Sequence, residues 1–158
     1  MSEIRVGIGF DSHPSDEGRP LVLGGVTFPG ATGLAGHSDG DVVCHALADA
    51  LLGGGALGDI GQHFPDDDPA IAGIGGLEIL ARVMRLLEGA GLRPSSCDLV
   101  VIAARPHLAE RREELRGSLA RALRLSPEVV SVKATRPEGL GLTGEGVGCM
   151  AVAVIGEA

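Results

Sequence analysis

Potential metal ligands occur in two short segments of this chain, and they restrict the folds that it can adopt. Asp11 and His13 follow an apolar segment, and residues two apart in an extended strand project to the same side. Asp41 and His45 are one turn apart on a predicted helix and share a face. If the end of the strand meets the helix, Asp11, His13 and His45 surround an ion and leave its fourth position open. That arrangement is typical of catalytic zinc.

Each of these residues also has an ordinary structural interpretation. Taken alone, Asp11 is better explained as a helix-capping residue, and each histidine as a partly buried side chain with common hydrogen bonds. The combination, in glycine-rich surroundings, favours a metal site. Asp41 is predicted to orient the second ring nitrogen of His45, and Asp49, one turn further along, is a weaker candidate. Cys44 points about 100° away from His45 on a helix, so we assign it to the core.

Composition excludes several classes of function. At 158 residues with 44% hydrophobic content, the chain fits a single domain, residues 1–158, with a sizeable core. A net charge of −8, three Phe and no Trp or Tyr argue against nucleic-acid binding. Three cysteines without a Cys-x-x-Cys pair indicate a reducing compartment, so we expect a cytoplasmic protein. The first residues show no export signal, and no apolar run approaches the roughly 20 residues that cross a bilayer.

Hydrophobic periodicity predicts strands and helices in alternation. Strands are predicted at residues 4–10, 21–23, 26–28, 99–103, 129–135 and 148–155, with Gly24-Gly25 suited to a hairpin turn. One helix is predicted to be capped by Ser38 or Asp39, with Asp41 in its first turn, and to weaken at residues 53–55. Two more are predicted at residues 77–87 and 110–125, with loops at 59–69 and 136–147. The pattern favours an α/β (α+β) fold with helices packed on a mixed sheet.

Three further segments carry polar groups but little specificity. Asp59 follows a glycine, as do acidic residues that bind ribose hydroxyls, yet surface turns rich in Asp and Pro are common. The Gly7-x-Gly9 pair is too short to be identified as a phosphate loop. Residues 133–138 offer two cations, a hydroxyl and a carboxylate, and a surface turn of mixed charge explains them equally well.

The motifs together resemble a known family. In order along the chain, they are Gly9-Phe10-Asp11-Ser12-His13, Gly36-His37-Ser38-Asp39-Gly40-Asp41 with His45, Asp49-Ala50-Leu51-Leu52, Leu57-Gly58-Asp59-Ile60-Gly61 and Phe64-Pro65-Asp66. With this spacing the chain resembles the 2-C-methyl-D-erythritol 2,4-cyclodiphosphate synthase family over about residues 5–154. The resemblance implies a homotrimer of ferredoxin-like subunits, with active sites between subunits.

The resemblance also implies an activity. The family converts 4-diphosphocytidyl-2-C-methyl-D-erythritol 2-phosphate into the cyclic 2,4-diphosphate and releases CMP, in non-mevalonate isoprenoid biosynthesis. That reaction makes it a phosphorus–oxygen lyase. By resemblance, Asp11, His13 and His45 hold zinc, Glu138 holds magnesium or manganese, and His37 stabilises the transition state. The expected substrate contacts are Asp11, His13, His37, Ser38, Asp59, Ile60, Gly61, Phe64, Pro65, Asp66, Asp68, Ala103, His107, Thr135, Arg136 and Glu138.

The second half of the chain departs from the family pattern. Arg136 occupies a catalytic threonine position, and the following Pro137 lacks an amide donor. His107 stands where lysine is common. Leu142 and Glu145 stand where many members place Phe and Arg around a cavity on the trimer axis. Arg136 and Pro137 leave open one alternative, a trimeric metal-binding homologue that acts as a scaffold. A zinc hydrolase of another phosphoanhydride is a second alternative, which fits the ligands equally but not the many matching flanking residues.

Overall fold

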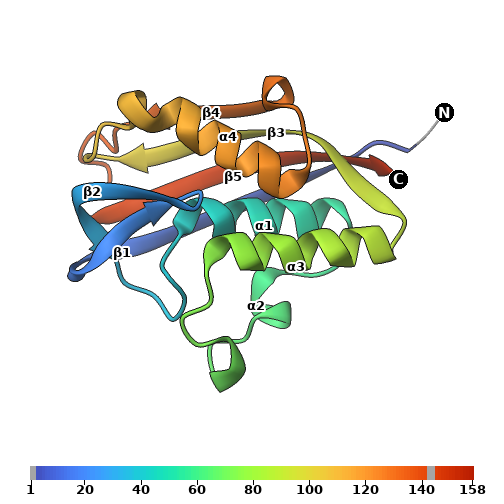
Figure 1. Ribbon diagram of the computed structural model, residues 1–158, viewed down its shortest axis with the longest axis horizontal. Helices are drawn as coiled ribbons and strands as arrows, with labels where there is room; N and C mark the ends of the chain where they lie inside the picture. The colour runs from blue at the N-terminus through green and yellow to red at the C-terminus, as the bar shows by residue number, and fades with distance from the viewer. Residues whose placement is uncertain (1–2, 142–144) are drawn as a thin grey trace.

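A five-stranded mixed sheet forms the backbone of the computed structural model, which describes residues 3–141 and 145–158 (Figure 1). The strands lie in the order β2-β1-β5-β3-β4, and only β3 and β4 run parallel to each other. Their bounds are β1 Arg5–Leu23, β2 Val26–Leu34, β3 Leu92–Ala103, β4 Val130–Thr135 and β5 Gly146–Glu157. The predicted α+β class with a mixed sheet is confirmed.

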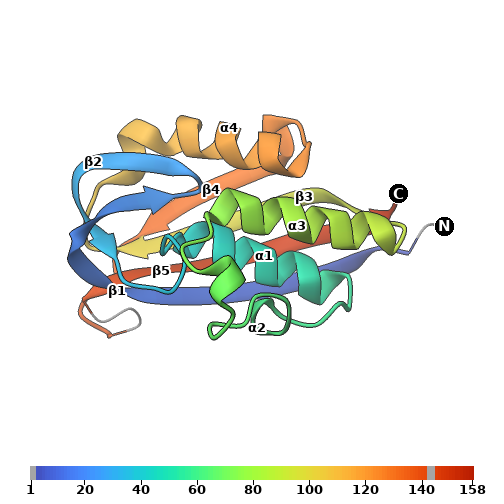
Figure 2. The same cartoon turned by 60° about the horizontal axis from the view of Figure 1, so that its bottom comes forward.

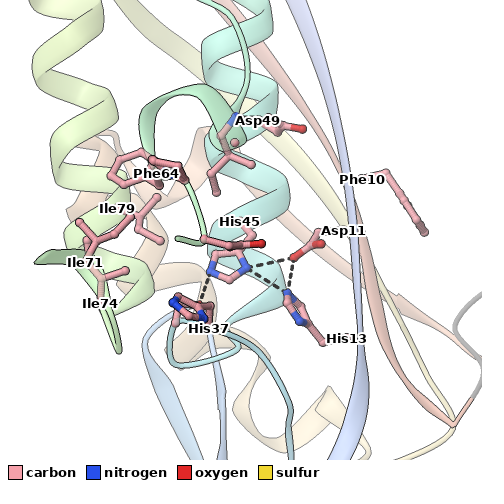
Figure 3. A pocket seen from close by; sticks show the side chains of 15 residues that line it. Phe10, Asp11, His13, His37, His45, Asp49, Phe64, Ile71, Ile74 and Ile79 are labelled. Atoms are coloured by element: carbon pink, nitrogen blue, oxygen red, sulfur yellow. Dashed lines mark hydrogen bonds and ion pairs between the residues drawn. The ribbon is translucent and has the colours of Figure 1, made fainter. Parts of the chain in front are cut away.

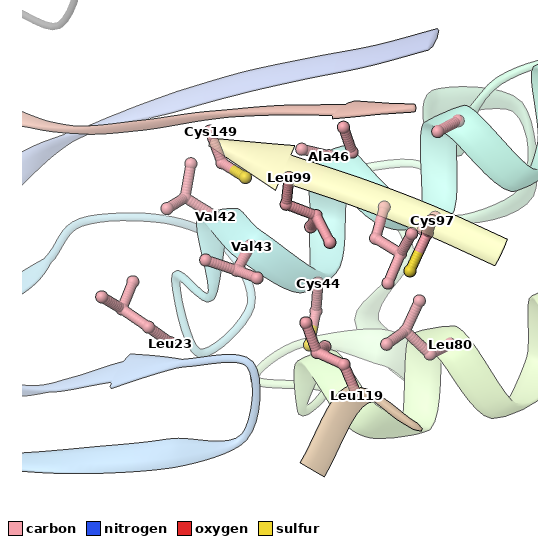
Figure 4. Packing of buried hydrophobic residues seen from close by; sticks show 14 of the residues in the cluster. Leu23, Val42, Val43, Cys44, Ala46, Leu80, Cys97, Leu99, Leu119 and Cys149 are labelled. Atoms are coloured by element: carbon pink, nitrogen blue, oxygen red, sulfur yellow. The ribbon is translucent and has the colours of Figure 1, made fainter. Parts of the chain in front are cut away.

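The helices cover one face of this sheet (Figure 2). The long helices are α1 Val42–Gly54, α3 Gly76–Gly89 and α4 Arg112–Leu123, and the short helix α2 spans Ile60–His63. Short 3-10 turns lie at Pro69–Ile71, Leu108–Arg111 and Pro127–Val129. The core between the helices and the sheet includes the thiols of Cys44, Cys97 and Cys149, which are buried and free (Figure 4). Burial raises the pKa of Cys97 to about 12. The assignment of Cys44 to the core is confirmed.

Several predicted boundaries were wrong. β2 runs to Leu34 and not only to residue 28, and β3 begins at Leu92 and not at residue 99. β1 continues through Asp11 and His13 as far as Leu23, so these residues lie inside a long strand and not at its end. The segment 59–69, predicted as a loop, contains α2 and the beginning of a 3-10 turn, because Asp59 and Asp68 each cap a helical turn with their side chains.

Asp41 is the residue that caps α1, in place of the predicted Ser38 or Asp39. Its buried carboxylate accepts hydrogen bonds from Cys44 N at 3.1 Å, Gly24 N at 2.8 Å and Gly25 N at 2.7 Å. Burial raises the pKa of Asp41, and these three amide donors oppose that shift. The Asp41 side chain therefore joins the β1–β2 turn to the start of α1. Neither the sequence of the turn nor that of the helix start reveals this link.

Two glycines of β1 allow α1 to lie directly against the strand. A Cβ atom at Gly7 would lie 1.8 Å from Ala50 O, and one at Gly9 would lie 1.9 Å from Ala46 O. Both oxygens belong to the backbone of α1, so a side chain at either position would push the helix away. The Gly7-x-Gly9 pair thus serves helix packing, and this close approach brings His45 near Asp11.

Replacing Gly9 with alanine is expected to destabilise the fold and separate α1 from β1. Overpacking of this kind costs about 1–3 kcal/mol or more, measurable as a lower free energy of unfolding in urea. Gly89→Ala is the matched control, because a Cβ there meets nothing within 4 Å. It should leave stability unchanged or slightly higher. Equal stability of the Gly9→Ala and wild-type proteins would contradict the packing argument.

Candidate metal centre

The side chains of Asp11, His13 and His45 point at one another across the junction of β1 and α1 (Figure 3). His13 Nε2 lies 2.8 Å from Asp11 Oδ2, and His45 Nδ1 lies 3.0 Å from the same oxygen. The two ring nitrogens are 3.2 Å apart. Three donor atoms on two different elements therefore form a small triangle.

The triangle suits a metal ion. Tetrahedral zinc with bonds of about 2.0–2.1 Å separates its ligand atoms by about 3.3 Å, so the three donors already lie near the positions that one ion requires. A ring nitrogen carries at most one proton, so His13 Nε2 cannot donate fully to both Asp11 and His45. A cation would satisfy all three lone pairs at once. One carboxylate and two imidazoles leave a coordination position free for another oxygen ligand.

The electrostatics of the triangle favour a charged pair in the metal-free protein. Burial would raise the pKa of Asp11, but its hydrogen bonds to His13 and His45 outweigh burial and lower that pKa. The hydrogen bond to Asp11 raises the pKa of His13, although burial opposes the shift. A bound cation has to displace the proton from His13, because metal ligation requires the neutral imidazole.

Ser38, and not Asp41, contacts the second ring nitrogen of His45. Ser38 Oγ lies 2.9 Å from His45 Nε2 and also accepts from Gly40 N at 3.2 Å. The prediction that Asp41 orients His45 was wrong, because the Asp41 carboxylate is already used by backbone amides. Asp49 is not the orienting group either, since its Oδ1 accepts from Ile60 N at 2.8 Å.

The triangle opens into a cavity of about 440 Å³. Its wall includes ten of the residues expected at the site, namely Asp11, His13, His37, Ser38, His45, Ile60, Gly61, Phe64, Pro65 and Asp66. Four apolar side chains that sequence reasoning missed also line it, namely Phe10, Ile71, Ile74 and Ile79. The isoleucines lie in or next to a segment with many Gly and Pro residues, so their local pattern gave no signal. Asp59 and Asp68 are absent from this wall, and their carboxylates cap helical turns.

The remaining expected residues lie elsewhere in the subunit. Arg136 and His107 line two adjoining cavities of about 300 and 250 Å³, with Glu138 in the first and Ala103 and Thr135 in the second. None of these residues lines the cavity at the metal ligands. Within one chain, the expected site is therefore divided into two parts.

The two positions expected on a trimer axis can be located only in part. Glu145 is exposed and lines a cavity of about 600 Å³ with Arg105 and His107. Leu142 lies outside the described residues. Within the part of the chain that the structure describes, no helix is long and apolar enough to cross a membrane.

The fold and the triangle define an α+β protein with a possible metal site at the junction of a strand and a helix. The chain belongs to the YgbB family, whose sequence pattern matches residues 4–156.

Named relatives are similar over nearly the whole chain. A 2-C-methyl-D-erythritol 2,4-cyclodiphosphate synthase of Pelotomaculum thermopropionicum is 52% identical over 96% of this chain and 93% of the relative. A bifunctional enzyme IspD/IspF of an Anaeromyxobacter species is 50% identical over 96% of this chain, which spans only 39% of that relative. A solved structure of 2C-methyl-D-erythritol-2,4-cyclodiphosphate synthase in a CDP-bound form superposes with a TM-score of 0.88. The two sequences are 41% identical, and the superposition covers 96% of this chain and 99% of the chain in the solved structure.

Zinc affinity is expected to fall with falling pH from a point above pH 6.5. The pKa of His13 is raised above its ordinary value of 6.5, so protons compete with the metal at a higher pH than for a free histidine. Below the raised pKa, each displaced proton weakens binding by up to about tenfold per pH unit. Competition with a chromophoric chelator between pH 5.5 and 8.5 measures this slope. A zinc affinity that is constant across that range would contradict the assignment of His13 as a ligand.

Proposed function

We propose that this protein, as one domain over residues 1–158, is a cyclising 2-C-methyl-D-erythritol 2,4-cyclodiphosphate synthase. Its substrate is 4-diphosphocytidyl-2-C-methyl-D-erythritol 2-phosphate, and it releases CMP in isoprenoid biosynthesis. The observation that carries the proposal is the convergence of Asp11, His13 and His45 on one point at a cavity wall, in a chain about 50% identical to synthases. The three free, buried thiols support a cytoplasmic location.

The reaction is an intramolecular phosphoryl transfer. An oxygen of the 2-phosphate bonds to the β-phosphorus while the bond from that phosphorus to the oxygen bridging the α-phosphate breaks, and CMP leaves with that oxygen. This outcome defines a phosphorus–oxygen lyase. Both reacting groups belong to one molecule. The protein therefore has to bring the 2-phosphate close to the β-phosphate and neutralise their charge, and no covalent enzyme intermediate is needed.

The residues at the cavity have different roles in this reaction. Asp11, His13 and His45 would hold zinc, which when bound supplies a Lewis acid for a phosphate oxygen. His37 and Ser38, on the cavity wall, donate hydrogen bonds to phosphate oxygens. The apolar part of the wall, including Phe64, excludes water from the methylerythritol end.

The second group of residues serves the nucleotide end. Glu138 offers an exposed carboxylate, the ligand type that magnesium or manganese prefers. Arg136 supplies a cation where the family has a threonine hydroxyl, so it binds phosphate by charge and by its planar fork of donors. Ala103, His107 and Thr135 enclose the cytidine side.

We infer that the two groups meet between subunits of a trimer of ferredoxin-like chains. The face of the sheet opposite the helices carries exposed apolar side chains, namely Val6, Ile8 and Phe10 of β1 and Met150 and Val152 of β5. Strand pairing joins them, since Ile8 is opposite Val152 and Phe10 is opposite Met150. A contiguous apolar patch of this kind is typical of an interface. Phe10 also borders the cavity from the far side of β1 (Figure 3), so this face reaches the candidate site.

The wild-type protein with zinc and magnesium is expected to convert the diphosphocytidyl substrate into cyclic diphosphate and CMP, both visible by phosphorus NMR. His13→Ala should lower turnover by at least about a thousandfold, because it removes a metal ligand. His63→Ala is the matched control, since this exposed histidine donates to the Leu57 carbonyl oxygen and does not line the cavity at the ligands. It should turn over at the wild-type rate.

Two results would contradict the proposed activity. If folded, metal-loaded wild-type protein releases no CMP, the chain is not a synthase and the scaffold alternative stands. If it releases CMP together with an uncyclised methylerythritol that carries two separate phosphates, in place of the cyclic product, it is a hydrolase.

Placing a charge on the apolar sheet face is expected to dissociate the trimer. Ile8 is 71% exposed in the single chain, and Ile8→Glu would bury a carboxylate in the proposed interface at a cost of several kcal/mol. Light scattering coupled to size exclusion should give a trimer for the wild type and a monomer for this variant. Leu86→Glu on α3, at a residue that is 37% exposed, is the control and should remain trimeric. A monomeric wild type, or a trimeric Ile8→Glu variant, would refute the inferred interface.

A further inference from the structure

The segment 35–41 carries His37 and Ser38 from the end of β2 to the start of α1. Both side chains line the cavity, so their positions depend on how the backbone of this segment is held. One side is held by Gly73, whose amide donates to His37 O at 2.9 Å. Asp39 adds support from within, since its carboxylate accepts from Asp41 N at 3.0 Å and Gly76 N at 2.9 Å.

Arg19 holds the other side of the segment. Its guanidinium donates through Nη1 to Gly36 O at 2.8 Å and through Nη2 to Ser38 O. With the bond from Gly73, three consecutive carbonyl groups, at residues 36–38, are engaged by donors. A planar guanidinium can donate to two carbonyl groups at once in a fixed geometry, which a lysine ammonium cannot reproduce.

The backbone of Arg19 is itself fixed by an irregularity in β1. Pairing with β2 shifts register between Asp16 and Pro20, and Asp16 Oδ1 accepts from Gly18 N at 2.9 Å within this turn. Gly33 of β2 lies against it, because a Cβ there would be 2.2 Å from Arg19 O. The Arg19 backbone is therefore closely packed against β2, and its guanidinium extends from there to the segment 35–41.

The contacts of Arg19 continue toward the metal centre through Ser38. The Ser38 hydroxyl meets His45 Nε2 at 2.9 Å, while the ligand atoms themselves belong to β1 and α1. Loss of Arg19 should therefore loosen His37 and Ser38 and leave the three ligands in place.

We propose that Arg19 is a positioning residue for the cyclisation. By holding the carbonyl groups of Gly36 and Ser38, it fixes the side chains of His37 and Ser38 against the reacting phosphates. The kinetic part of this proposal rests on the proposed function, whereas the structural part does not.

Hydrogen exchange tests the structural part without any activity. Arg19→Met should speed exchange of the hydrogen-bonded amides of Asp39, Gly40 and Asp41 by about tenfold or more, because it removes two charge-assisted hydrogen bonds that hold this segment. Arg93→Met is the matched control. Arg93 is an exposed arginine that likewise donates to a backbone carbonyl, Glu157 O at 3.3 Å, and it lies away from the segment 35–41. Unchanged exchange in Arg19→Met would overturn the proposal, whether or not the wild type is active.

Kinetics test the functional part. Arg19→Met should lower kcat by about tenfold to a hundredfold, the usual loss for a misplacement of about 1 Å, while zinc affinity stays within about threefold of the wild type. Arg19→Lys should be intermediate, because it keeps the charge and loses the fork. In a Ser38→Ala background the loss caused by Arg19→Met should shrink, since one of the two groups that Arg19 positions is already gone. Fully additive losses, or a loss of zinc affinity as large as the loss of kcat, would overturn the positioning role.

Discussion

The whole candidate site depends on how closely one helix approaches one strand. The α1 backbone lies against β1 because Gly7 and Gly9 have no side chains to keep it away. Only at this distance can Nδ1 of His45 come within 3.0 Å of the Asp11 carboxylate. The buried Asp41 fixes the start of the same helix by binding amides of the β1–β2 turn. Packing and capping together therefore set the geometry that a metal ion would use, before any metal binds.

The two faces of the sheet differ in what covers them. The helical face is filled by the core and carries the three ligands at its edge, whereas the opposite face leaves β1 and β5 apolar and exposed. The residues expected to bind the nucleotide line cavities separate from the one at the ligands. Assembly through the apolar face gives a physical reason for that division, because a second copy would supply the missing half of each site. The same assembly would cover surface that is costly to expose to water.

Much of the site could be predicted from the sequence because its signals are local. The periods of a strand and of a helix place Asp11 with His13 and set the direction of His45. The meaning of Gly7 and Gly9 could not be predicted, because it depends on which helix lies over the strand. Two of the three amide partners of Asp41 are 16 and 17 residues away in the chain, so a local pattern suggested the wrong role. Strand and helix types were predicted well, but their boundaries were not. β1, β2 and β3 are longer than predicted, and the side chains of Asp59 and Asp68 cap short turns in a segment predicted as a loop.

The most direct test of this account is a crystal structure with zinc and CDP, with diffraction measured at the zinc absorption edge. The account predicts an anomalous peak bonded to Asp11, His13 and His45 at about 2.0–2.2 Å. It also predicts that the nucleotide bridges two subunits: it lies in the cavity lined by these three ligands in one subunit and contacts His107 or Arg136 of a second copy. A peak at other residues, or a nucleotide held entirely by one chain, would contradict it.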